Sequence, residues 1–71
     1  METFKMRGTE IELFKLLKAS GLAESGGQAK FAISEGRVTV NGTVETKKAC
    51  KIKAGDKVES EGKSIIAEAG E

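Results

Sequence analysis

Histidine and proline are absent from this 71-residue sequence, and cysteine occurs once, at position 50. A single thiol cannot close an intramolecular disulfide, and without histidine the chain has too few ligands for a zinc site. No serine or cysteine has a candidate base beside it, and there is no nucleotide-binding loop. We therefore expect a protein that is not an enzyme and that uses no cofactor, no metal ion and no small-molecule substrate.

Long hydrophobic runs are also missing. The first residues, METFKMRGTE, contain no apolar stretch typical of a signal peptide, and no later run is long enough to span a membrane. A lone thiol fits a reducing setting. A chain of this length is expected to form a single small domain, residues 1–71, which buries about 60% of its unfolded surface. The sequence thus predicts a cytoplasmic domain without a membrane partner.

Charge is distributed unevenly, although the net charge is only +1. Residues 26–53 contain six basic and two acidic residues, a net charge of +4, whereas residues 54–71 contain two basic and five acidic residues, a net charge of −3. A basic segment of this kind can bind phosphate groups even when the whole chain is near neutral. The alternative is a solvated surface with a few excess lysines, which is the commoner origin of a charge run.

The segment Ser25-Gly26-Gly27-Gln28 has the spacing of a capping box at the start of a helix. Its two glycines fall in the first turn, where no side chain covers the free N–H groups, so an anion can approach them closely. Lys30 follows, and the combination suits a phosphate group. The glycines could instead serve only to allow a tight bend or the close packing of another backbone segment. The motif alone does not separate these two interpretations.

Two helices are predicted on either side of a short link. The first is expected to begin with Thr9 as its cap and Glu12 completing a capping box, to run to about Ser20, and to stop at Gly21. Its apolar stripe at helical spacing consists of Leu13, Phe14, Leu16 and Leu17. The second helix is expected over about residues 26–35, ending at Gly36, with a core face of Ala29, Ala32 and Ile33.

Short strands account for the rest of the chain. Residues 3–6 are expected to form an edge strand, and residues 37–40 a strand that Asn41-Gly42 reverses, because a type I′ turn needs φ > 0 at both central positions. The return strand, residues 43–46, is expected to point Val44 inward. Turns at 54–57 and 61–62 then bound two further strands, and residues 68–71 are expected to be frayed.

The outward side chains of the second helix and of residues 47–53 are the remaining candidates. Phe31 lies opposite Ala29 on its helix and could stack on an RNA base, but packing is the favoured interpretation because phenylalanine more often buries area. Alternation in 47–53 directs Ala49 or Cys50 and then Ile52 inward, and it directs Lys47 or Lys48, with Lys51 and Lys53, outward, where lysine binds phosphate as a mobile point charge. Cys50 is expected to behave as a small core residue.

From residue 9 to about residue 60, these features resemble in order and spacing the RNA-binding domain named after small-subunit ribosomal protein S-four, also called the alpha-L motif. The matching positions are a helix start, a strand with its turn, a basic patch and a Gly-Asp pair: Ser25, Gln28, Ala29, Lys30, Gly36, Val38, Val40, Asn41, Gly42, Lys47, Lys48, Gly55 and Asp56. Many members carry arginine directly after the cap serine, where this chain has Gly26. In this respect the chain is similar to the small stand-alone bacterial members of the YbcJ-like subgroup.

The resemblance implies an α+β fold, in which two packed helices lie against a small, mostly antiparallel β-sheet. It also implies binding of structured RNA, either ribosomal or transfer RNA, by a bacterial accessory protein that acts on RNA alone or on a ribosomal particle. The residues expected to contact RNA are Ser25, Gly26, Gly27, Gln28, Lys30, Arg37, Asn41, Lys47, Lys48 and Lys51. The alternative is a small protein–protein interaction module with a ubiquitin-like sheet and no role with nucleic acid.

Overall fold

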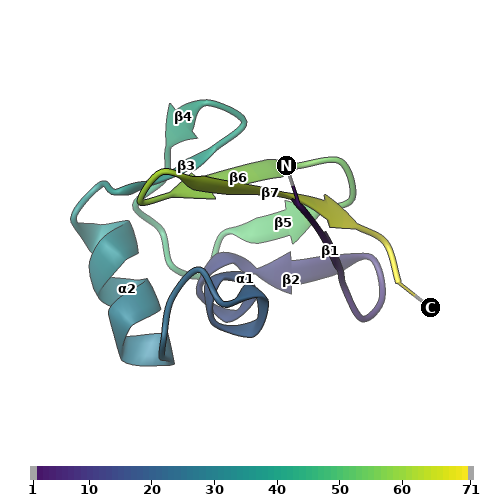
Figure 1. Cartoon of the computed structure of the whole chain (residues 1–71), viewed down its shortest axis with the longest axis horizontal. Coiled ribbons are helices and arrows are strands. Elements are labelled where there is room, and N and C mark those ends of the chain that lie inside the picture. The colour runs from purple at the N-terminus through teal and green to yellow at the C-terminus, as the bar shows by residue number, and fades with distance from the viewer. Residues whose placement is uncertain (1, 71) are drawn as a thin grey trace.

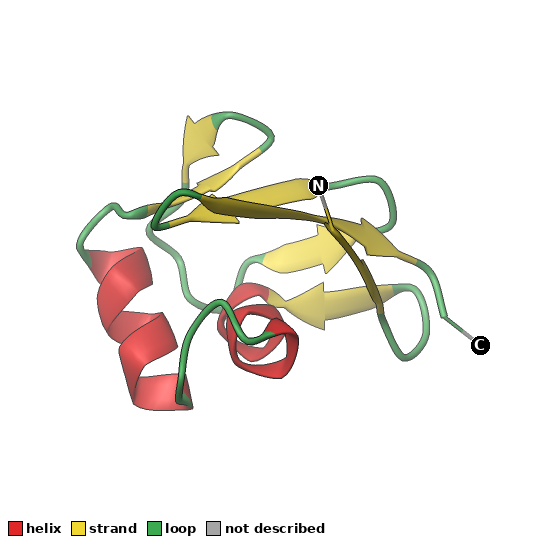
Figure 2. Cartoon of the chain, viewed as in Figure 1, coloured by secondary structure: helices red, strands yellow, loops and turns green. Residues whose placement is uncertain are grey.

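Two helices and two β-sheets make up the computed structural model, which describes residues 2–70. Both helices lie on the same side of the larger sheet, and the smaller sheet lies next to the first helix (Figure 1; Figure 2). The elements in chain order are β1 (Glu2–Lys5), β2 (Glu10–Glu12), α1 (Leu13–Ser20), α2 (Gly26–Ser34), β3 (Val38–Val40), β4 (Thr43–Val44), β5 (Lys51–Lys53), β6 (Lys57–Ser60) and β7 (Lys63–Glu68).

The larger sheet has the strand order β1-β7-β6-β3-β4, and β2 pairs with β5 in the smaller one. Among the pairings of residues 2–70, β1 with β7 is parallel and the others are antiparallel. Tight turns join β3 to β4 and β6 to β7, and a tight turn can join only antiparallel neighbours. The predicted α+β fold, with two packed helices and a mostly antiparallel sheet, is confirmed.

The hydrophobic core fills the space between the helices and the larger sheet. Full burial of one such leucine, isoleucine or valine side chain contributes about 1.5–3 kcal/mol, so this set holds the small domain together. Its buried apolar members are Met6, Leu13, Leu16, Leu17, Ala29, Ile33, Val38, Ile52, Val58, Ile65 and Ala67. Three of the four residues of the predicted α1 stripe are buried, and the fourth, Phe14, is half-buried at the surface.

The start of α1 differs from the prediction. Thr9 is not its cap: residues 10–12 form β2, which pairs with β5 in the register Glu12 to Lys51, and the helix begins only at Leu13. Its first free N–H groups donate to backbone carbonyls of a distant segment, Leu13 to Cys50 at 2.8 Å and Phe14 to Lys48 at 3.1 Å. Because these carbonyls satisfy the helix end, no side-chain cap is made.

The other helix boundaries agree with the sequence. Gly21 ends α1 in the left-handed region at φ 84°, and its N–H donates to the Lys18 carbonyl. Leu22, directly after it, is half-buried against the core, as expected for a helix C-terminus closed by glycine. Helix α2 ends at Ser34, and Gly36, with φ 73°, turns the chain into β3.

The β3–β4 hairpin has the predicted turn but not the predicted inward residue. Asn41 and Gly42 have φ of 53° and 84°, as a type I′ turn requires. Val44, however, is 54% exposed. It pairs directly with Thr39, and residues opposite each other in a ladder point to the same face. That face is the one opposite to the buried Val38, so Val44 points outward.

The C-terminal residues are tied to the N-terminal strand. Glu68, where fraying was expected to begin, is the last residue of β7 and pairs with Lys5, and its carbonyl accepts from the Met6 N–H at 2.8 Å. The Gly70 N–H donates to the Gly8 carbonyl at 3.1 Å. Met1 and Glu71 lie outside the described residues. Within residues 2–70, neither helix has the length or the apolar character needed to cross a bilayer.

Candidate nucleic-acid interface

Ser25 caps the start of α2 as predicted, but the hydrogen bond that the Gln28 side chain makes in return involves a different residue. Ser25 has extended backbone angles, and its Oγ accepts from the Gln28 N–H at 3.1 Å. The Gln28 side chain reaches back one residue further than expected, because its Oε1 accepts from the Glu24 N–H at 3.2 Å and not from that of Ser25. Two polar side chains therefore hold the α1–α2 link in place without covering the N–H groups of Gly26 and Gly27.

The two glycines leave the helix start open. Apart from the adjacent residues and the backbone of its own helix, a Cβ built on Gly26 would meet no atom of residues 2–70 within 4 Å, and one on Gly27 would meet the Ser25 Oγ at 3.8 Å. Neither glycine has a positive φ. Close packing and a left-handed backbone, the two structural reasons for glycine, are thus both absent in the described chain. Within residues 2–70 no oxygen accepts from either N–H group, which leaves two donors at the positive end of the helix.

The ammonium groups of Lys15 and Lys30 lie over Phe14 at the start of α1, and the backbone of Lys48 lies beside it. The Lys30 Nζ lies 5.0 Å from the centre of the Phe14 ring and the Lys15 Nζ lies 5.9 Å from it, both within the range of a cation–π contact. The Phe14 N–H donates to the Lys48 carbonyl, which brings the loop before β5 to the same place. We call Lys15, Lys30 and Lys48 the basic face.

The remaining predicted lysines, Lys47 and Lys51, lie on either side of Lys48 in the chain. Lys47 is exposed, and its N–H donates to the Glu45 carboxylate at 3.1 Å. Lys51 is exposed on β5 directly opposite Glu12. The Glu12 carboxylate is 3.0 Å from the Lys15 Nζ. That hydrogen bond, together with the positive charges of Lys15 and Lys51, lowers the pKa of Glu12 below its ordinary value, although partial desolvation acts in the opposite direction.

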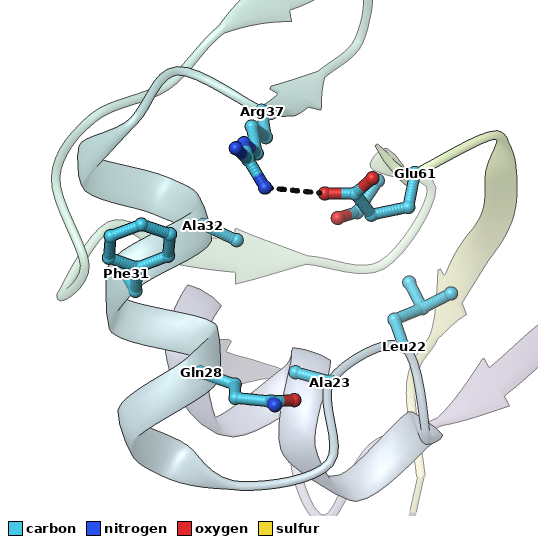
Figure 3. Close-up of a pocket in the computed structure, with 8 residues that line it drawn as sticks. Leu22, Ala23, Gln28, Phe31, Ala32, Arg37 and Glu61 are labelled. Atoms are coloured by element: carbon cyan, nitrogen blue, oxygen red, sulfur yellow. Dashed lines mark ion pairs between the residues drawn. The ribbon is translucent and has the colours of Figure 1, made fainter.

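Arg37 and Asn41 are held by other parts of the molecule. The Arg37 guanidinium lies 3.6 Å from the Glu61 carboxylate and 5.6 Å from the centre of the Phe31 ring (Figure 3). Asn41 is engaged by the turn before β6: its Nδ2 donates to Asp56, and its Oδ1 accepts from the Lys57 N–H at 2.9 Å. The structure therefore brings Lys30, Lys48 and the α2 start close to α1, and it holds Arg37 and Asn41 through contacts with β6 and its flanking turns.

The two phenylalanines of the helices differ from the sequence predictions to different degrees. Phe14, predicted as a core residue, packs against the core but is only half-buried, and two lysine ammonium groups lie over its ring. Phe31 was expected to pack, yet it is 56% exposed. Lys15 was not among the predicted contacts at all. The contact between Lys30 and Phe14 joins residues sixteen positions apart on two helices, so no local pattern could have predicted it.

Cys50 is half-buried beside the core, close to the predicted role. Burial, reinforced by the negative charge of Glu45 and a hydrogen bond to it, raises the pKa of the thiol. A neutral thiol is a weak nucleophile. No group of three or more acidic, cysteine or histidine side chains within residues 2–70 is arranged to hold a metal ion.

The capped and open α2 start, the α1–α2 pair and the sheet beside them together define a small α+β domain of the alpha-L type. The family model described as S4 domain matches residues 4–67. The chain therefore belongs to the S4 domain family.

Its relatives include two proteins of nearly the same length. The protein named putative RNA-binding protein YbcJ from Escherichia coli (strain K12) is 52% identical over 66 residues, which cover 92% of this chain and 94% of that one. The uncharacterized protein YbcJ from Shigella flexneri matches with the same identity and coverage.

Two solved structures share the fold. The solution structure of Escherichia coli YbcJ, described as revealing an alpha-L motif involved in RNA binding, superimposes with a TM-score of 0.75 at 50% identity over 97% of this chain and 89% of that one. The 30S ribosomal protein S4e from Thermoplasma acidophilum has a TM-score of 0.69 at 20% identity, covering 82% of this chain and 31% of that one. The second likeness concerns the fold alone.

Proposed function

We propose that this protein binds structured RNA, and that it holds the RNA backbone at the open start of α2 and with the lysines gathered around Phe14. The observation that carries the proposal is the pair of glycines at the α2 start, since nothing in residues 2–70 requires glycine there and both N–H groups are free to meet a phosphate. Membership of the S4 domain family and the name of the Escherichia coli relative support the same function.

The proposed RNA contacts are of two kinds, hydrogen-bond donors at the helix start and positively charged side chains. Ser25, Gly26, Gly27 and Gln28 form the helix start that receives one phosphate, and Lys30 and Lys48, aided by Lys15, neutralise neighbouring ones. Lys47 and Lys51 extend the positive surface toward β5, whereas Arg37 and Asn41 contact RNA at a separate place, beside β6 and its flanking turns. Such contacts follow the shape of a folded RNA and carry little sequence information.

In this proposal the whole chain acts as one RNA-binding domain, and the motif core spans about residues 9–60. It works in the cytoplasm as an accessory protein with no chemistry of its own. Its partner is a folded ribosomal or transfer RNA, either alone or within a ribosomal particle.

A protein–protein interaction module remains the competing function, and the exposed Phe31 and Val44 are the observations that favour it. The dependence of binding on ionic strength distinguishes the two functions. Binding through phosphate contacts weakens steeply as salt rises, because each neutralised phosphate releases a counterion, whereas an apolar protein contact changes little.

The test is an amide-shift titration of isotope-labelled protein with an RNA hairpin, first at low and then at moderate salt. We expect shifts at residues 25–30 and 47–51 that fade as salt increases. Replacing Lys30 or Lys48 by glutamine should weaken binding and reduce the slope of log affinity against log salt by about 1 for each lysine. Lys5→Gln, an exposed lysine on β1, is the matched control. Equal losses in all three variants would refute the proposed face.

A further inference from the structure

A cleft of about 280 Å³ opens on the side of α2 that carries Phe31. Leu22 lines it from the α1–α2 link and Gln28 and Ala32 line it from α2. Arg37, Ser60 and Glu61 close it from the sheet side. Figure 3 shows Phe31 on the outer side of α2, Arg37 and Glu61 at the sheet side, and Gln28 directed toward the α1–α2 link. The cleft therefore has one aromatic wall, an apolar base and charged groups at its rim.

The groups of this cleft are available to a ligand. Phe31 is 56% exposed, and the Arg37 guanidinium is 5.6 Å from its ring centre. The Arg37–Glu61 pair is separated by 3.6 Å with both side chains more than half exposed, so it contributes little and can open at small cost. Gln28 uses its Oε1 on Glu24, and its Nε2 has no acceptor among residues 2–70.

The cleft begins at the helix start that is proposed to hold phosphate. Gln28 belongs to both places, because its N–H is capped by Ser25 and its side chain lines the cleft. Lys30 and Phe31 are consecutive on α2, so they project from neighbouring stripes of the helix about 100° apart. A nucleotide whose phosphate lies at Gly26, Gly27 and Lys30 can thus direct its base toward Phe31.

We propose that this cleft receives one unpaired base of the bound RNA, stacked on the Phe31 ring, and that Glu61 makes guanine the preferred base. The inference rests on the proposed function, because the phosphate contacts bring the base to the cleft. Unpaired bases are commonly held by stacking on aromatic rings and on arginine, and by hydrogen bonds to their Watson–Crick edges. Phe31, Arg37 and Glu61 supply these three elements.

The preference for guanine follows from the carboxylate. An ionised glutamate offers two acceptor oxygens and no donor. Guanine presents two adjacent donors, N1–H and the N2 amino group, on its Watson–Crick edge. Adenine and cytosine place a ring acceptor beside their single amino group, and uracil places a carbonyl on each side of its N3–H. Against Glu61 these bases lose one hydrogen bond and face repulsion between acceptors.

The test uses hairpins with an identical stem and a short loop made of a single nucleotide type, either guanine, adenine, cytosine, uracil or an abasic residue. The abasic loop keeps every phosphate and removes the bases. Affinity and its salt dependence are measured for the unchanged protein, Phe31→Leu and Glu61→Gln. Val44→Thr changes another exposed large apolar side chain, which lies outside the cleft lining, and is the control.

We expect the unchanged protein to bind the guanine loop about 5- to 20-fold more tightly than the abasic loop, in the range known for one stacked base. Phe31→Leu should lose this difference and keep the salt slope, since Phe31 neutralises no phosphate. Glu61→Gln should keep the gain over the abasic loop and lose the preference for guanine. Val44→Thr should match the unchanged protein.

The two proposals fail in different ways. One outcome refutes the base cleft alone: binding depends on salt, but Phe31→Leu binds like the unchanged protein and the abasic loop binds as tightly as the guanine loop. This outcome points to a protein partner for the surface. An unaltered ranking of the loops in Glu61→Gln refutes the role of Glu61 in choosing guanine. If no hairpin binds in a salt-dependent manner, both the proposed function and the cleft are refuted.

Discussion

The Asn41 side-chain amide donates a hydrogen bond of 3.1 Å from Nδ2 to Oδ1 of Asp56, fifteen residues later in the chain. The same asparagine accepts from the Lys57 N–H through Oδ1, and the other oxygen of Asp56 accepts from the Lys53 N–H at 2.8 Å. The hairpin turn after β3 and the turn before β6 are therefore held together by one amide and one carboxylate. The Asn-Gly and Gly-Asp elements of the motif have a shared structural role.

Replacing Asn41 by aspartate should destabilise the fold by about 1–2 kcal/mol, because the donor is lost and two carboxylates then face each other. Adding Asp56→Asn should restore most of the loss, since the new amide can donate to residue 41 and accept from Lys53. Urea denaturation of both single variants and the double variant measures the coupling. Additive losses in the double variant would show that the two side chains do not act as a pair.

Gly26→Asp should change stability and RNA binding in opposite directions. The carboxylate would lie in the first turn of α2, where a negative charge stabilises a helix by about 0.3–1 kcal/mol. A Cβ at this position has open space around it. The same charge repels a phosphate at this place, and RNA affinity should fall at least about tenfold. Gly26→Asn has nearly the same shape without the charge. Equal RNA affinity of the two variants would argue against a phosphate at the helix start.

The two predicted caps should respond differently to alanine. Ser25→Ala removes the oxygen that accepts from the Gln28 N–H and should cost about 1 kcal/mol. Thr9→Ala should cost less than about 0.5 kcal/mol, because Thr9 precedes β2 and the α1 start is satisfied by the carbonyls of Lys48 and Cys50. Thermal unfolding monitored by circular dichroism compares them. A larger loss for Thr9→Ala would contradict the β2–α1 boundary.

Cys50 should react slowly with iodoacetamide, because burial and the nearby Glu45 raise the pKa of its thiol. The folded thiol holds its proton more tightly than an unfolded cysteine with a pKa of about 8.5. The stability that the raised pKa of Cys50 contributes is thus complete below the unfolded pKa of about 8.5. It is lost as pH rises through the higher pKa of the folded protein. Alkylation rates measured against pH should show a raised midpoint that Glu45→Gln shifts back downward. An unshifted midpoint in the unchanged protein would contradict the assigned environment.

Local chemistry accounts for much of what could be predicted. The Ser25 cap, the Gly21 helix end and the Asn41-Gly42 turn each depend on the backbone angles and side chains of a few neighbouring residues, and each is found where the sequence indicated. The buried face of α1 likewise follows from the spacing of its leucines. Lys51 is exposed on β5, as its alternation with Ile52 indicated. Alternation directed either Lys47 or Lys48 outward, and both are exposed because they precede the strand.

The sequence by itself determined where helices are capped, where turns reverse and which residues alternate, because these depend on short-range sterics and hydrogen bonds. Tertiary structure alone decided the start of α1, since the carbonyls that satisfy it lie more than thirty residues away at Lys48 and Cys50. It also decided the outward direction of Val44, through the register with Thr39, and the meeting of Lys30 with Phe14. Such contacts join segments that are far apart in the sequence and leave no local pattern, so the surface proposed to bind RNA is formed only when the chain folds.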